Sequence, residues 1–174
     1  MKACIHRGAR QIGGTCIEVV ESSGARLILD VGTPLDTDAG SAELPSTLGQ
    51  NVDVAGVVVS HPHTDHYGLV GSLPAEAPIL IGESAQAILE AAGDFIPSRA
   101  SFANTIALQD RKTVELGAFR ITPYLMDHSA YDSYAILVEA DGNSLFYTGD
   151  LRAQAQDSWV TGQSSNSATA CRLH

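Results

Sequence analysis

The run HPHTDH, residues 61–66, brings four potential metal ligands together within six positions: His61, His63, Asp65 and His66. Neutral imidazole and carboxylate together suit zinc, with manganese or iron as alternatives. A metal-bound water loses its proton near neutral pH, so such a site supplies a nucleophile for hydrolysis. His61 and His63 can approach one ion from an extended backbone, while Asp65 and His66 can reach a second. The pattern therefore predicts a hydrolase with two neighbouring metal ions.

The metal-binding run begins where an apolar stretch, VAGVVVS at 54–60, ends. The length and the β-branched content of this stretch predict a buried strand. Open α/β sheets place their ligands beyond the C-terminal ends of their strands. The run therefore lies where such sheets bind ligands, as expected for a set of metal-binding residues.

An H-x-H-x-D-H run after a hydrophobic strand resembles the signature of the metallo-β-lactamase fold superfamily of hydrolases. Three further segments match that family in order: RLILDVG at 26–32, MDHS at 126–129 and YTGD at 147–150. Two longer segments, IGGTCIEV at 12–19 and DHSAYDSYAILVEADGNSLFYTGDLRA at 127–153, look most like the ribonuclease J and beta-CASP group of nucleic-acid-processing enzymes. The resemblance implies an α/β protein with the αββα sandwich of that superfamily.

The same resemblance implies roles for individual residues. The first metal would be bound by His61, His63 and His128. The second would be bound by Asp65 and His66, with Asp150 as a bridge between the two ions. Asp65 would also be the catalytic residue that orients water or shuttles its proton, and Asp30 would support the ligands from behind. One or two zinc ions are the cofactor that this set implies.

The chain departs from the family after the YTGD segment. The family normally continues well past that point and supplies a last histidine to the second metal, and the beta-CASP insertion is missing here as well. Residues 153–174 are rich in Ser, Ala, Gln, Thr and Asn without a sustained period, and His174 is the one histidine they contain. We therefore expect a metal-binding core at 1–152, a polar tail at 153–174 and a C-terminally truncated sandwich.

Length and composition predict one ordinary globular domain, with 174 residues of which 44% are hydrophobic and 17% charged. No apolar run is long enough to cross a membrane and no secretory signal is visible, so a cytoplasmic protein is expected. The net charge of −10 opposes tight binding of nucleic acid, which requires Lys and Arg to displace counterions from phosphates. A small phosphodiester or another small ester is the substrate class expected.

The remaining chain predicts elements that would form the sandwich. The expected strands lie at 15–20 and 26–31, 78–81, 113–116 and 119–125, and 134–139 and 144–148. The expected helices are a short one at 66–73 and an Ala-rich one at 83–92 that ends at Gly93. Residues 36–50 are predicted to form a polar loop beside the active site.

Three functions agree with these features. The first is hydrolysis of phosphodiesters or related small esters by a mononuclear or dinuclear metal site, and the second is ring opening of a lactam or lactone at the same site. The third is a non-catalytic metal-binding remnant of a ribonuclease-like enzyme. Truncation would also expose apolar sheet surface that a second copy could cover, so a homodimer is expected.

Overall fold

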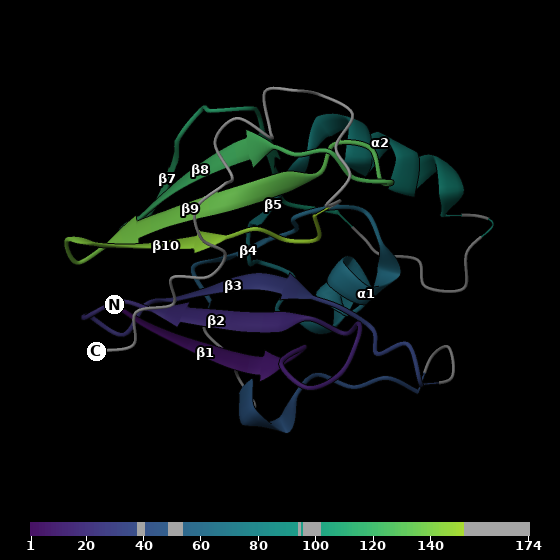
Figure 1. Ribbon diagram of the computed structural model, residues 1–174, viewed down its shortest axis with the longest axis horizontal. Helices are drawn as coiled ribbons and strands as arrows, with labels where there is room; N and C mark the ends of the chain where they lie inside the picture. The colour runs from purple at the N-terminus through teal and green to yellow at the C-terminus, as the bar shows by residue number, and fades with distance from the viewer. Residues whose placement is uncertain (38–40, 49–53, 94, 96–101, 152–174) are drawn as a thin grey trace.

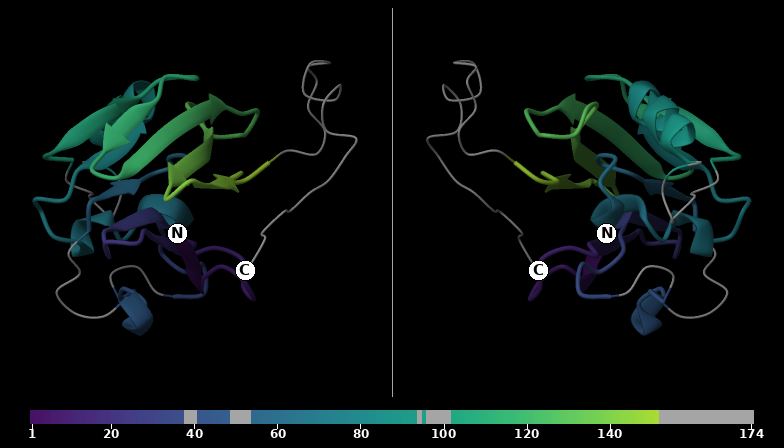
Figure 2. Two further views of the ribbon diagram at one scale, coloured as in Figure 1. Left: turned by 90° about the vertical axis from the view of Figure 1, so that its left-hand side faces the viewer. Right: turned by 90° about the vertical axis from the view of Figure 1, so that its right-hand side faces the viewer.

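The strands of this protein form two sheets that lie one above the other (Figure 1) and are seen edge-on in Figure 2. The computed structural model describes residues 1–37, 41–48, 54–93, 95 and 102–151. Within these ranges the first sheet has the order β1-β2-β3-β4-β5-β6 and the second has the order β10-β9-β8-β7.

The first sheet consists of β1 (Lys2–Arg7), β2 (Cys16–Val20), β3 (Arg26–Val31), β4 (Gly56–Val58), β5 (Ile79–Gly82) and β6 (Thr105–Leu108). The second consists of β7 (Val114–Leu116), β8 (Phe119–Leu125), β9 (Tyr134–Ala140) and β10 (Asn143–Tyr147). The helices are α1 (Thr64–Tyr67) and α2 (Glu83–Ala92), with short 3-10 turns η1 (Ser46–Leu48) and η2 (Val70–Ser72).

Strand direction decides where the site can form. In the first sheet β1, β2 and β3 are antiparallel neighbours, whereas β3, β4, β5 and β6 run parallel to one another. The C-terminal ends of β3, β4 and β5 therefore meet at one edge of this sheet. The second sheet is antiparallel throughout, so the end of β8, the start of β9 and the end of β10 share one edge too.

The central strands of the first sheet are buried on both faces. In β3, Leu27 and Leu29 pack towards the second sheet, whereas Ile28 packs towards the helices. Val58 and Val57 alternate in the same way in β4, as the two-residue period of a strand requires. The helical layer contributes Ala85 and Leu89 of α2 among others. The described residues thus supply both sheets and one helical layer of the expected αββα sandwich.

Most predicted elements are found at or near their predicted bounds. The helix at 83–92 is confirmed as α2, which ends against Gly93, and the first hairpin is confirmed as β2 and β3. The helix predicted at 66–73 was wrong in extent, because the chain forms α1 earlier and then the separate turn η2. The strand predicted at 54–60 is shorter, since β4 ends at Val58 where the chain turns into the metal-binding run.

Two strands have no counterpart among the predicted elements. β1 is an edge strand whose side chains alternate poorly between exposed and half-buried, so it carries no two-residue hydrophobic period. β6, with the sequence TIAL, is the opposite edge strand and is too short for a period to be visible. The predicted polar loop at 36–50 contains η1, and the predicted tail at 153–174 with His174 lies outside the described residues.

The outer face of the second sheet is only partly polar. The rings of Tyr124 in β8 and Phe146 in β10 lie there with their centroids 6.0 Å apart, and Phe146 is 56% exposed.

The homodimer and the cytoplasmic location expected from the sequence are not tested by a single chain and stay predictions. In the part of the chain that the structure describes, no helix has the length and apolarity needed to span a membrane.

Candidate metal centre

Backbone hydrogen bonds hold the metal-binding run against the residues just before β2 and just after β3. The carbonyl of Asp65 accepts a hydrogen bond from the Thr15 amide at 3.0 Å, and the carbonyl of Thr64 accepts one from the Thr33 amide at 3.0 Å. Gly32 makes this approach possible, because a Cβ atom at that position would lie 1.6 Å from the Asp65 carbonyl oxygen. Gly32 is therefore required by the close contact between the run and β3.

Three histidines form the first candidate ligand group. The ligand nitrogens of His61, His63 and His128 all lie within 4.8 Å of one another. His61 and His63 follow β4, whereas His128 comes from the loop after β8 in the other sheet. Nε2 of His128 is 3.3 Å from Nδ1 of His63, so these two ring nitrogens face each other. Three converging imidazoles are a ligand set that suits a tetrahedral zinc site with one open position.

A second candidate group overlaps the first. His61, His66 and Asp150 also offer ligand atoms within 4.8 Å of one another. Asp150 follows β10, and its Oδ1 atom lies 3.5 Å from Nε2 of His66, while Oδ2 of Asp65 lies 3.7 Å from the same nitrogen. The structure thus brings the six predicted site residues together. It differs from the expectation in that His61 belongs to both groups and Asp65 stands beside them; the role of these residues as ligands stays a prediction.

The environment of His61 fits a metal ion. Its side chain is 2% exposed, and Nδ1 lies 3.0 Å from the Ser60 hydroxyl. Nε2 is buried, yet among the described residues it has no hydrogen-bond partner, which is rare for a buried polar atom. Burial, assisted by the charge of His66, lowers the pKa of His61 to about 3. The ring therefore stays neutral at physiological pH and keeps a lone pair available for an ion.

Asp30 accepts hydrogen bonds from residues that surround the candidate ligands. It is fully buried and adopts a left-handed backbone conformation with φ of 56°. Its Oδ1 accepts the Ser60 amide at 2.7 Å, and its Oδ2 accepts the Ser60 hydroxyl at 2.7 Å, Nδ1 of His66 at 2.7 Å and the Tyr147 hydroxyl at 2.5 Å. With Nδ1 of His66 held in this way, Nε2 is left to face Asp150.

The protonation of the groups around Asp30 follows from these contacts. Burial alone would lower the pKa of His66, but the hydrogen bond to Asp30 and the nearby carboxylate charges outweigh it and raise that pKa. Burial and the Asp30 charge raise the pKa of Tyr147 well above its ordinary value, so the phenol remains a donor. Asp30 was expected from the sequence, whereas Ser60 and Tyr147 were not. Ser60 directly precedes His61, and Tyr147 is the first residue of the YTGD segment, so their places beside the predicted ligands were the available signal.

Replacing Asp30 with asparagine should weaken both the fold and the site. An amide offers one oxygen where the carboxylate offers two, so at least one buried donor loses its acceptor. We expect the free energy of unfolding of the metal-free protein to fall by about 1–3 kcal/mol in a urea titration. Zinc affinity, measured against a chromophoric chelator, should fall by about 10–100-fold because His66 loses its orientation. Ser60→Ala, which removes one donor only, serves as the milder control; unchanged zinc affinity in Asp30→Asn would contradict this role.

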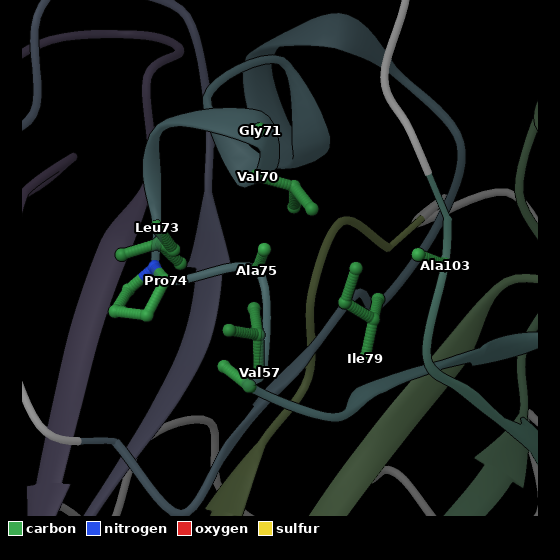
Figure 3. Close-up of a pocket in the computed structure, with 9 residues that line it drawn as sticks. Val57, Val70, Gly71, Leu73, Pro74, Ala75, Ile79 and Ala103 are labelled. Atoms are coloured by element: carbon green, nitrogen blue, oxygen red, sulfur yellow. The ribbon is translucent and has the colours of Figure 1, made fainter.

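A small apolar pocket lies elsewhere, on the helical side of the first sheet (Figure 3). Its lining includes Val57, Val70, Leu73, Ile79 and Ala103, and none of its side chains carries a polar group. No predicted site residue lines it. The chemistry of this protein is therefore expected at the histidine groups rather than in this pocket.

This chain is similar in sequence to proteins of one superfamily. The sequence profile of the beta-lactamase superfamily domain matches residues 32–164. The RNase J-like protein of Methanocaldococcus jannaschii is 25% identical over 155 residues, covering 84% of this chain and 35% of that protein. RNase aCSPSF2 of Saccharolobus solfataricus is 30% identical over 161 residues, covering 83% of this chain and 32% of that protein. The chain thus spans about a third of the length of these curated relatives.

Solved structures show a similar architecture. The metallo-beta-lactamase fold protein YhfI from Bacillus subtilis superimposes with a TM-score of 0.62 at 20% sequence identity. The match covers 85% of this chain and 61% of that protein. At this level of identity the likeness is one of fold.

Proposed function

We propose, from the premise that this chain belongs to the beta-lactamase superfamily, that it is a metal-dependent hydrolase. The observation that carries the proposal is the pair of overlapping ligand groups at the strand ends, His61, His63 and His128 with His61, His66 and Asp150. The buried Nε2 of His61, which among the described residues lacks a hydrogen-bond partner, supports it further.

The residues suit one or two zinc ions, with manganese or iron as alternatives. His61, His63 and His128 would hold the first ion, and His66, Asp65 and Asp150 the second, with Asp150 between the two. When bound, such ions supply Lewis acidity and an acidified water. Imidazole nitrogens and carboxylate oxygens are the donors these metals prefer. His61 and His66 are buried, whereas Asp150 is exposed.

Each side chain has a distinct task in this scheme. His61 presents a neutral nitrogen because burial opposes its protonation. His66 is held by Asp30 so that its Nε2 faces the site. Asp65 has a partly exposed carboxylate, 19% accessible, and in this proposal it would orient the attacking water and accept its proton.

Phosphodiesters are the proposed substrate class. Curated relatives of this chain are named as RNases, which supports a phosphodiester over other bonds. The net charge of −10 disfavours a long polyanion, and two divalent ions would offset it locally by roughly four charges. A short oligonucleotide or a small phosphodiester fits both observations, and tight binding of long nucleic acid is not expected.

The test compares bond types on zinc-loaded protein. We expect hydrolysis of bis(p-nitrophenyl) phosphate and of a short RNA oligonucleotide to exceed hydrolysis of a chromogenic β-lactam and of a lactone. A chelator should abolish the activity, and added zinc should restore it. The double variant His61→Ala, His63→Ala, purified in the same way, controls for contaminating nuclease.

Each other outcome selects one of the remaining functions. Faster turnover of the β-lactam or the lactone would replace the proposal with a ring-opening hydrolase. Metal binding without turnover of any of the four substrates would indicate a non-catalytic metal-binding protein.

A further inference from the structure

The loop that carries His128 is closed at its base. The amide of Met126, just after β8, donates to the carbonyl of Ser133, just before β9, at 2.9 Å. The hydroxyl of Ser133 donates to the carbonyl of Ala130 at 2.9 Å. These bonds fix the two ends of the loop. The amide of Tyr134 also donates to the carbonyl of Ser60 at 2.8 Å, which joins the base of the loop to the segment that carries His61.

Asp132 adds a connection between this loop and helix α2. Its Oδ2 atom accepts hydrogen bonds from the amides of Ser84 at 2.9 Å and Ala85 at 3.3 Å, in the first turn of α2. Its Oδ1 atom accepts the hydroxyl of Tyr134 at 2.9 Å. The residue at the N-cap position of α2 is Gly82, which has no side chain to cap the helix. Asp132 thus caps α2 from 48 residues further along the chain.

Gly82 leaves the space that this contact requires, because it has no side chain. A Cβ atom at Gly82 would lie 2.5 Å from Oδ2 of Asp132 and 2.7 Å from its Cγ atom. Any other residue at position 82 would therefore displace the carboxylate. Asp132 itself has φ of 59°, a left-handed conformation that aspartate tolerates better than most residues. Gly82 thus leaves the space that the carboxylate occupies, and Asp132 tolerates the backbone conformation found at its position.

We propose that Asp132 is a positioning residue for His128, and that it acts by capping α2. Helix α2 packs through Ala85 and Leu89 into the same core as β4, the strand that leads into His61 and His63. The cap therefore joins the loop of the second sheet to the helical layer of the first, in addition to the bond from the Tyr134 amide to the Ser60 carbonyl. In this proposal it helps to set the distance between His128 and its two partner histidines. The inference rests on the proposed metal-binding function.

The test measures zinc affinity and the absorption spectrum of the cobalt-substituted protein in three variants. Asp132→Gly removes the carboxylate and keeps the left-handed backbone accessible, Gly82→Ala displaces the carboxylate from the helix side, and Asp132→Asn keeps one acceptor. We expect Asp132→Gly and Gly82→Ala to lower zinc affinity by about 10–100-fold and to weaken the cobalt band as His128 leaves the ion. Asp132→Asn should recover part of both signals.

The matched control is Asp141→Gly. Asp141 is also left-handed, with φ of 53°, but it lies in the turn between β9 and β10, at the end of these strands away from the histidines. Its side chain bonds to Ser22 and to the amino terminus. This variant should lose stability in a denaturant titration without changing zinc affinity or the cobalt spectrum.

A thermodynamic cycle with His128→Ala separates positioning from general stabilisation. In that background Asp132→Gly should cause no further loss of zinc affinity, although it should still lower stability. If Asp132→Gly and Gly82→Ala destabilise the protein yet keep zinc affinity within about twofold and leave the cobalt band intact, the proposal is overturned. Wild-type protein that binds neither ion overturns the proposed function as well, whereas wild-type protein that binds zinc without hydrolysing any substrate overturns only the function.

Discussion

Replacement of His61 and His63 together with alanine should abolish zinc binding and reduce metal-dependent hydrolysis to the background rate. The first ligand group would keep His128 alone, and a zinc site that loses two of three protein ligands retains little affinity. The second group would be damaged as well, because it also contains His61. Metal content by atomic emission and turnover of a phosphodiester would measure the two effects, with circular dichroism to show that the variant is folded.

Single variants should show which ligand group holds which metal ion. His63→Ala should release the ion of the first group and spare the second, and His66→Ala should do the reverse. His6 provides a matched control, since it is a histidine on β1 that bonds to Glu18 and Thr47 outside the site. His6→Ala should retain full metal content. Undiminished activity in a metal-free double variant would rule out the proposed chemistry.

Asp150→Asn should lower turnover by about 100-fold or more, which corresponds to a barrier increase of about 2.7 kcal/mol. The substitution keeps the shape of the side chain but removes the negative charge that would hold two cations at a short separation. The side chain is 51% exposed, so the free energy of unfolding of the metal-free protein should change by no more than about 0.5 kcal/mol. Steady-state kinetics and a urea titration measure the two quantities.

Asp127→Asn is the control for Asp150→Asn. Asp127 is exposed, adjacent to His128 in sequence and absent from both ligand groups among the described residues. Its amide variant should hydrolyse substrate at the wild-type rate. Wild-type turnover in Asp150→Asn would refute the bridging role of that carboxylate.

Local sequence patterns predicted much of this fold. The hairpin of β2 and β3 and the bounds of α2 followed from alternating apolar residues, helix-forming alanines and a terminating glycine. The metallo-β-lactamase fold was predicted from four motifs, and the likeness to RNase J proteins was predicted from two longer segments. Both are confirmed, by the family match and by the relatives. These features succeed because each depends on a short stretch of chain.

The features that were missed depend on how distant segments pack. The sharing of His61 between two groups is set by the position of the second sheet over the first, and no spacing within residues 61–66 encodes it. The hydrogen bond from Tyr147 to Asp30 joins residues 117 positions apart, and the cap of α2 by Asp132 is of the same kind. Sequence order identified the chemical groups of the site but could not assign their supporting contacts.

The two ligand groups lie across the junction between the sheets, because His61, His63 and His66 follow β4 whereas His128 and Asp150 follow β8 and β10. An ion held there would act as a cross-link between the layers, comparable in effect to a disulfide. Metal binding would then resist shear of one sheet over the other and add to global stability by mass action. Metal loading would thus restrain the two sheets against each other in addition to the apolar core that already packs between them.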